Sequence, residues 1–166
     1  SLKGKLVMAQ AEAPSVDNLG FDLELKASAI PLLRCDADTL PAERRFVQAW
    51  PEVAEFIKDF DGYGPVDLAF HLRKAPGPHQ SIEFVEGTLN FRECSARYIQ
   101  FPYRLNRLKG VVHFRADGRI ALENITGEHG TARVAINGLL GGRLSQQGDL
   151  TITGQGIDLD QDLLTC

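Results

Sequence analysis

The sequence lacks any long apolar run and has no strong excess of charge of one sign. No apolar stretch approaches the roughly 18 residues that a membrane-spanning helix requires. Lys and Arg number 18 against 22 Asp and Glu, the formal net charge is -4, and the longest basic run is the pair Arg44-Arg45. We therefore expect no membrane-spanning segment in this chain and no nucleic-acid partner.

Cysteine is scarce and widely spaced. Cys35, Cys94 and Cys166 form no C-x-x-C pair, and no histidine stands at metal-ligand spacing from them. We expect them to be small buried or terminal residues. A disulfide between Cys35 and Cys94 stays open as an alternative for an exported protein.

Catalytic patterns are absent as well. No Ser or Cys occupies a nucleophile elbow of the G-x-S-x-G kind, and the Asp-rich end at 158–162 has Leu163 where a calcium loop needs glycine. The histidines are scattered along the chain at His71, His79, His113 and His129. We therefore predict that the protein is not an enzyme and that it has no catalytic, cofactor-binding or metal-binding residues.

What the sequence does contain is strand periodicity. With 166 residues, 43% of them hydrophobic, the chain is long enough for one folded domain with its own core. Apolar and polar residues alternate over most of its length, which is typical of strands with one face in water. The alternating segments are centred on 66–72, 82–84, 89–91, 112–114, 120–122, 134–136 and 150–152.

The links between these segments are short. Asp117-Gly118 has the chemistry of a two-residue hairpin turn, since glycine accepts a positive φ. Such links leave no room for crossover helices, so the strands should pair antiparallel in a meander. Phe84 and Leu89 differ by an odd number, and a bulge near Gly87 would bring both to the same face.

One segment has helical spacing instead. Thr39 is an N-cap candidate and Pro41 suits a first turn, whereas Pro51 would cost about 3 kcal/mol inside a helix. We therefore expect a kink between helices at 41–49 and 51–60 that pack on one end of the sheet. The apolar positions are Val47, Trp50, Val53, Phe56, Ile57 and Phe60.

The predicted fold class is thus mainly β (α+β). It is a strongly twisted antiparallel meander of about seven or eight strands with one kinked helical segment packed on its apolar face.

The chain also resembles itself at long range. Residues 21–32 align without a gap with residues 148–159, and Gly4-Lys5-Leu6 matches Gly142-Arg143-Leu144 upstream. Such a recurrence is typical of a tandem array, and we expect the chain to be part of a longer protein. We divide it into the end of one repeat at 1–36, the helical segment at 37–62, the meander at 63–147 and the start of the next repeat at 148–166.

The order of several short motifs resembles one repeat of the large AsmA-like envelope proteins of bacteria. The motifs are Gly-Pro-Val-Asp-Leu at 64–68, Gln-Phe-Pro-Tyr-Arg-Leu at 100–105, Lys-Gly-Val-Val at 109–112, Ile-Thr-Gly-Glu-His-Gly at 125–130 and Ile-Asp-Leu-Asp at 157–160. The resemblance implies a long curled sheet with an apolar groove, and a role in lipid transport or outer-membrane maintenance. It also implies a periplasmic or cell-envelope location in a membrane-anchored protein, with neighbouring repeats of the same polypeptide and lipid as partners.

The apolar face supports a groove. Eight strands at about 4.8 Å spacing form a sheet about 40 Å wide, whereas a helix about 10 Å across covers roughly two strands. For any single residue an ordinary closed core is an equal explanation, and a surface or adhesion-type β-repeat that binds protein or carbohydrate is the alternative function. The expected groove residues are Phe70, Leu72, Phe84, Phe91, Phe114, Leu122 and Ile136.

Overall fold

Every complete element in the described part of the chain is a β-strand. The computed structural model describes residues 1–8, 19–31, 59–98, 101–141 and 148–157. The strands are β1 (Leu2–Met8), β2 (Leu19–Pro31), β3 (Phe60–Tyr63), β4 (Pro65–Lys74), β5 (Glu83–Tyr98), β6 (Phe101–Arg115), β7 (Ile120–His129), β8 (Ala132–Leu140) and β9 (Asp149–Gln155).

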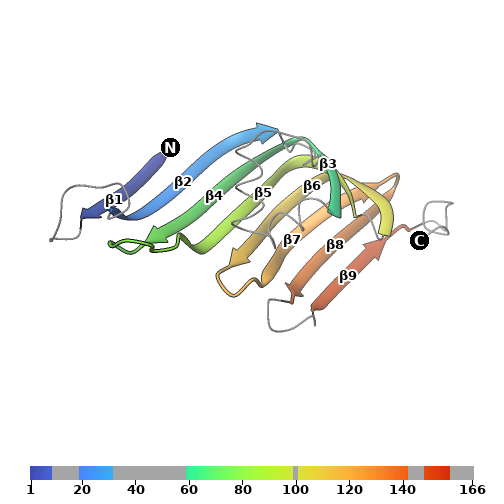
Figure 1. Cartoon of the computed structure of the whole chain (residues 1–166). Coiled ribbons are helices and arrows are strands. Elements are labelled where there is room, and N and C mark those ends of the chain that lie inside the picture. The colour runs from blue at the N-terminus through green and yellow to red at the C-terminus, as the bar shows by residue number, and fades with distance from the viewer. Residues whose placement is uncertain (9–18, 32–58, 99–100, 142–147, 158–166) are drawn as a thin grey trace.

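These nine strands form one antiparallel sheet in the order β1-β2-β4-β5-β6-β7-β8-β9, with β3 paired to the far end of β5. Apart from β3, each strand pairs with its neighbours in the sequence, so the predicted antiparallel meander is confirmed. The sheet is twisted and open, with β1 at one edge and β9 at the other (Figure 1).

The prediction of an α+β fold with about seven or eight strands and a packed helix was wrong, because the described residues form a nine-stranded sheet of strands only. Most of the predicted helical segment at 37–62, namely residues 37–58, lies outside the described residues. Phe60, the last apolar position of that pattern, instead begins β3 and pairs with Tyr98. β5 extends beyond the end of β4, so its backbone groups there need a partner, and β3 supplies it.

The hairpin between β6 and β7 also differs in detail from the two-residue turn expected. Gly118 N–H donates to Arg115 O at 2.9 Å and Arg115 N–H donates to Arg119 O at 3.0 Å. Residues 116–118 therefore form the loop, with Gly118 at φ 80 in the left-handed region. The predicted position of the hairpin was correct, but its loop has three residues where two were expected.

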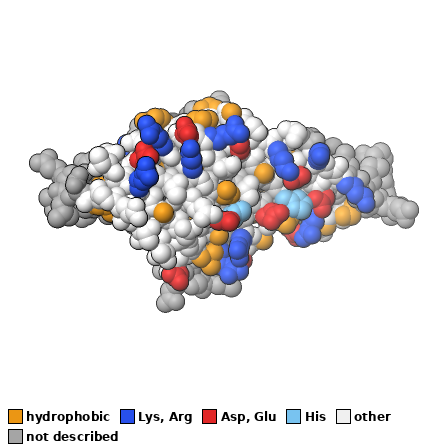
Figure 2. Space-filling view, turned by 180° about the vertical axis from the view of Figure 1, so that it is seen from behind, with side chains coloured by type: hydrophobic (Ala, Val, Ile, Leu, Met, Phe, Trp, Pro, Cys, Tyr) orange, Lys and Arg blue, Asp and Glu red, His pale blue; other side chains and the backbone are white. Residues whose placement is uncertain are grey.

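The two faces of the sheet are chemically distinct. Leu68, Leu89, Val112 and Leu122 stand opposite one another from β4 to β7, and they belong to the apolar face. The core residues on this face are Val66, Leu89, Phe91, Cys94, Ala96, Leu108, Val112, Phe114, Ile120 and Ile125. The other face carries many charged side chains, and Figure 2 shows it directly, from the side opposite to the view of Figure 1.

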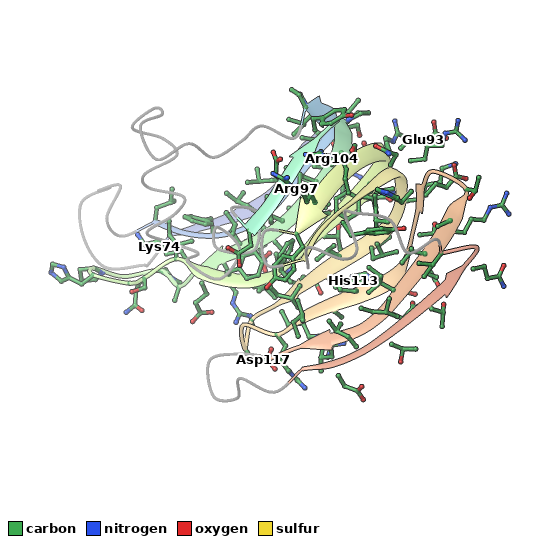
Figure 3. The ribbon with its side chains drawn as sticks, turned by 90° about the vertical axis from the view of Figure 1, so that its right-hand side faces the viewer. Lys74, Glu93, Arg97, Arg104, His113 and Asp117 are labelled. Atoms are coloured by element: carbon green, nitrogen blue, oxygen red, sulfur yellow. The ribbon has the colours of Figure 1, made fainter. Side chains whose placement is uncertain are left out.

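A band of positive φ values crosses the sheet and bends its strands. The band consists of Ala29, Glu93, Gly110, Asn124 and Gly138, one each on β2, β5, β6, β7 and β8, with φ values of 53, 60, 120, 50 and 145. Register shifts accompany the first four. Bulges bend a strand and increase its twist, so this bulge band explains the curved sheet of Figure 3.

The predicted bulge between Phe84 and Leu89 is also confirmed. His71 stands opposite Glu86, but the next residue, Leu72, stands opposite Phe84, so the ladder skips Val85. The extra residue lies at Val85, two positions before Gly87. It brings Phe84 and Leu89 to the apolar face, as the sequence required.

Candidate apolar groove

The apolar face is hollowed over β5 to β9. A cavity of about 170 Å³ lies there, and its wall is almost entirely apolar. Its lining residues are Phe91, Ala96, Tyr98, Tyr103, Leu105, Leu108, Val112, Leu122, Ile125, Val134, Ile136, Ile152 and Ile157. Because β5 to β9 all contribute to the wall, the shape of the cavity depends on the curvature of this part of the sheet.

Three of the seven expected groove residues line this cavity: Phe91, Leu122 and Ile136. Leu72 and Phe114 are instead buried in the core. The remaining two form a ring contact outside the cavity.

That contact joins Phe70 and Phe84 on the neighbouring strands β4 and β5. Their ring centroids are 6.1 Å apart and the planes are tilted by 60°. The spacing is typical of an aromatic pair that packs edge toward face. Both side chains are partly exposed. They therefore extend the apolar face toward the β1–β2 side of the sheet.

Several lining residues were not expected from the sequence, and bulges explain why. Phe91 and Ala96 both face the cavity although they differ by an odd number, because the one extra residue of β5 between them, Glu93, changes the parity of the strand. Leu122 and Ile125 do the same on either side of Asn124. Counting alternate residues fails across such shifts. The missed signal was the aromatic pair Tyr98 and Tyr103 at the β5–β6 hairpin.

One end of the cavity reaches the edge of the sheet. Ile152 and Ile157 line the cavity and yet remain 63% and 45% exposed. Leu150, also on β9, is 41% exposed. Large apolar side chains grouped at a sheet edge are unusual on a protein surface and mark a contact site. The cavity is therefore an open trough at β9 rather than a closed hole.

Tyr103 is fixed on the cavity wall by His129. The two rings are stacked, with centroids 4.0 Å apart and an interplanar angle of 27°. His129 Nδ1 lies 2.7 Å from Arg104 O, an arrangement in which the ring N–H donates to the carbonyl. The histidine predicted to have no catalytic role thus positions an aromatic wall residue.

A cluster of charged groups holds β3 against β5 and β6 near the cavity. Asp61 Oδ2 accepts from Arg104 Nη2 at 2.7 Å and from Arg97 Nη2 at 3.2 Å. Both arginines lie close together beside β3 in Figure 3. Ser95, which is buried, donates its hydroxyl to Asn106 Oδ1 at 2.9 Å. This cluster stabilises the short strand that the sequence did not predict.

Cys94 is a free, buried thiol. The expected alternative of a bridge to Cys35 is therefore not formed. Cys94 Sγ donates to Pro65 O at 2.8 Å, and burial raises the pKa of the thiol because the thiolate would lose its hydration. The residue acts as a small core group beneath the break between β3 and β4.

The polar face carries a ladder of ionisable side chains. The register places Lys3, Glu24, His71, Glu86 and Arg115 side by side across five strands. Side chains that stand directly opposite one another on neighbouring strands lie close enough to interact. Lys26 donates to Glu24 and lowers the pKa of that carboxyl. The ladder gives this face a hydrophilic surface without a net charge of one sign.

A larger hollow of about 830 Å³ lies beside the bulge band on the polar face. Four of its five charged lining residues pair with one another: Lys109 Nζ lies 2.8 Å from Glu93 Oε1, and Arg107 Nη1 lies 3.0 Å from Glu128 Oε2. The hydrogen bond from Lys109 lowers the pKa of Glu93. Charges that are mutually satisfied offer little to a ligand, so the smaller apolar cavity is the stronger candidate site.

Within the described ranges, no three His, Cys, Asp or Glu side chains are grouped as a metal ion would require. The same part of the chain holds no helix with the length and apolarity needed to cross a membrane. Comparison of the chain with models of known protein families, with curated proteins and with solved structures found no match.

Proposed function

We propose that this chain is a non-enzymatic module of a larger bacterial envelope protein of the AsmA-like kind, and that it supplies part of an apolar groove for lipid acyl chains. The observation that carries the proposal is the apolar trough on one face of an open, curved sheet, which reaches the edge at Ile152 and Ile157. Such a trough suits a long apolar ligand that enters from the edge.

The size of the cavity sets how much of a lipid one module holds. An apolar cavity of about 150 Å³ accommodates a ligand of the size of benzene. The cavity here, at about 170 Å³, therefore takes only a short length of an acyl chain. The rest of the chain must lie along the open trough at β9, where apolar side chains are exposed, and on neighbouring modules.

The test uses palmitate as the probe and native mass spectrometry as the measurement. Ile152→Glu places a carboxylate on the trough wall, and we expect palmitate binding to weaken by about tenfold or more, since a polar group in an apolar wall must lose hydration when the ligand binds. Thr151→Glu is the matched control, because Thr151 is the adjacent exposed residue on the opposite face. It adds the same charge and should leave binding unchanged.

Both variants should keep the circular dichroism spectrum of the wild type, since both positions are exposed. Absence of palmitate binding by the wild type, or equal loss in the two variants, would contradict the lipid groove.

A further inference from the structure

The hairpins at the two edges of the sheet have the same internal register. In β1–β2, Leu2 stands opposite Leu25 and Gly4 stands opposite Leu23. In β8–β9, Ile136 stands opposite Ile152 and Gly138 stands opposite Leu150. The pairing residues fall in the same sequence order, Leu-Lys-Gly at 2–4 and Ile-Asn-Gly at 136–138. The sequence alignment of β2 with β9 therefore extends to their hairpin partners.

The two glycines lie against equivalent backbone groups, although only Gly138 has a positive φ. A Cβ at Gly4 would lie 2.7 Å from Asp22 O, and a Cβ at Gly138 would meet Asp149 O and lie 2.9 Å from Leu150 Cα. In each hairpin a glycine thus lies against the backbone of an Asp-Leu pair. Gly4 and Gly138 therefore occupy equivalent positions in the two copies of the repeat, whereas sequence alone had matched Gly4 with Gly142. The correction brings the strand β1 into correspondence with β8.

Because β1 is equivalent to β8 and β2 to β9, the outer edge of β9 can be compared with an edge of β2. β2 pairs with β1 on one side and with β4 on the other. β9 pairs with β8, the counterpart of β1, and no described strand covers its other side. The outer edge of β9 therefore corresponds to the edge of β2 that β4 occupies. In the antiparallel order, β1 and β8 run in one direction and β2 and β9 run in the other. An added strand that runs antiparallel to β9 would therefore have the same direction as β4 and would continue the antiparallel pattern of the sheet.

The chemistry of β4 shows what such a strand needs. Leu72 and Phe70 of β4 stand opposite Leu23 and Leu25. The carboxylate of Asp22 contacts His71 Nε2 at 2.6 Å. The corresponding groups on β9 are Leu150, Ile152 and Asp149, all exposed. A strand with apolar residues at alternate positions would cover the apolar side chains, and a donor such as His71 would hydrogen-bond to the Asp149 carboxylate.

We propose that the outer edge of β9 is a strand-docking edge, and that it accepts an antiparallel strand with the residue pattern of β4 in the register that β4 has on β2. The inference rests on the two hairpins and not on the lipid, so it stands or falls separately from the groove. The affinity comes from backbone hydrogen bonds along the edge, and the register comes from the apolar positions that face the trough.

The test is register-specific disulfide trapping of a capped peptide with the sequence of residues 65–74. Thr151 corresponds to Glu24, which stands opposite His71. The protein carries Thr151→Cys together with Cys35→Ser and Cys166→Ser, and the peptide carries the replacement His71→Cys. In a glutathione redox buffer we expect a mixed disulfide, measured by mass spectrometry, at about tenfold or more above a peptide with Phe70→Cys, which points to the other face.

Two controls complete the test. A scrambled peptide with the same cysteine should not be trapped, and trapping at Thr131→Cys, an exposed turn position, should be weak. Bound peptide should also slow amide exchange in β9. Equal trapping of the His71→Cys, Phe70→Cys and scrambled peptides, or no trapping of any, would overturn the proposal. Palmitate binding is measured separately, on the protein without peptide, so that failure of the strand-docking edge and failure of the lipid groove are distinguished.

Discussion

Gly110 is a position in the bulge band where one methyl group would meet the backbone of the next strand. Its φ is 120, and a Cβ there would contact Asn124 O and lie 2.7 Å from Ile125 Cα. Gly110→Ala therefore adds backbone strain and a clash that side-chain rotation cannot relieve. We expect the free energy of unfolding to fall by about 3 kcal/mol, measured by urea denaturation.

Gly130 provides the matched control for this substitution. It also has a positive φ, 57, but a Cβ there would have no atom within 4 Å. Gly130→Ala should cost only about 1 kcal/mol, the price of the left-handed conformation alone. A cost at Gly110 no larger than that at Gly130 would mean that the sheet can relax at the bulge band, and that the band does not fix its curvature.

At the scale of the strand, bulges are held by side chains of the neighbouring strand. Ala29 N–H, displaced from the ladder of β2, donates to Asp67 Oδ1 at 2.8 Å, and Asp67 Oδ2 lies 2.8 Å from Arg92 Nε. Asn124 N–H donates to Asn137 Oδ1 at 2.7 Å in the same way. An acceptor on the next strand thus replaces the carbonyl that the bulge removes.

Asp67→Asn and Asp67→Ala separate the two contacts of this carboxylate. Asn keeps an oxygen for Ala29 N–H and loses only a partly exposed ion pair, so we expect a loss of about 0.5 kcal/mol or less. Ala removes both contacts and should cost about 1–1.5 kcal/mol. Urea denaturation of both variants is the measurement. Equal losses would show that the ion pair with Arg92, rather than the bulge contact, is what matters.

The strands were predictable from sequence wherever alternation is uninterrupted. The alternation from Val66 to Leu72 is enough to assign the two faces of β4. The hairpin between β6 and β7 is marked by Asp117-Gly118, because glycine accepts the positive φ of the turn. Prediction failed where a bulge changes the parity within a strand. Glu93 has no sequence mark of a positive φ. Asparagine adopts a positive φ more often than most residues, but Asn124 alone does not reveal a bulge, so the faces of the residues after these two positions could not be assigned by counting.

The short strand β3 was missed for a different reason. Phe60 continued a helical spacing, and the residues Asp61 to Gly64 have the composition of a turn. What makes them a strand is the unpaired end of β5 and the contacts of Asp61 with two arginines that lie far along the chain. Tertiary contacts of this kind override local propensity, and no local pattern reports them.

At the scale of the whole molecule, the sheet is an array in which strands mainly contact their neighbours in the order β1-β2-β4-β5-β6-β7-β8-β9. The core lies under β4 to β7, where Leu89, Val66 and Val112 are almost completely buried. β9, by contrast, is exposed along its full length. Stability in such an array should be graded from the centre to the edge rather than uniform.

Native-state hydrogen exchange measures this gradient directly. We expect the amides of β9 to exchange through local opening at least about tenfold faster than those of β5 and β6, because detaching β9 breaks only its pairing with β8 whereas opening β5 disrupts the core on both sides. Mass spectrometry of peptides covering 83–98, 101–115 and 149–155 gives the three rates. Equal protection of β9 and β5 would show that the sheet opens only as a unit, and a strand at the edge of β9 would then have no opening to suppress.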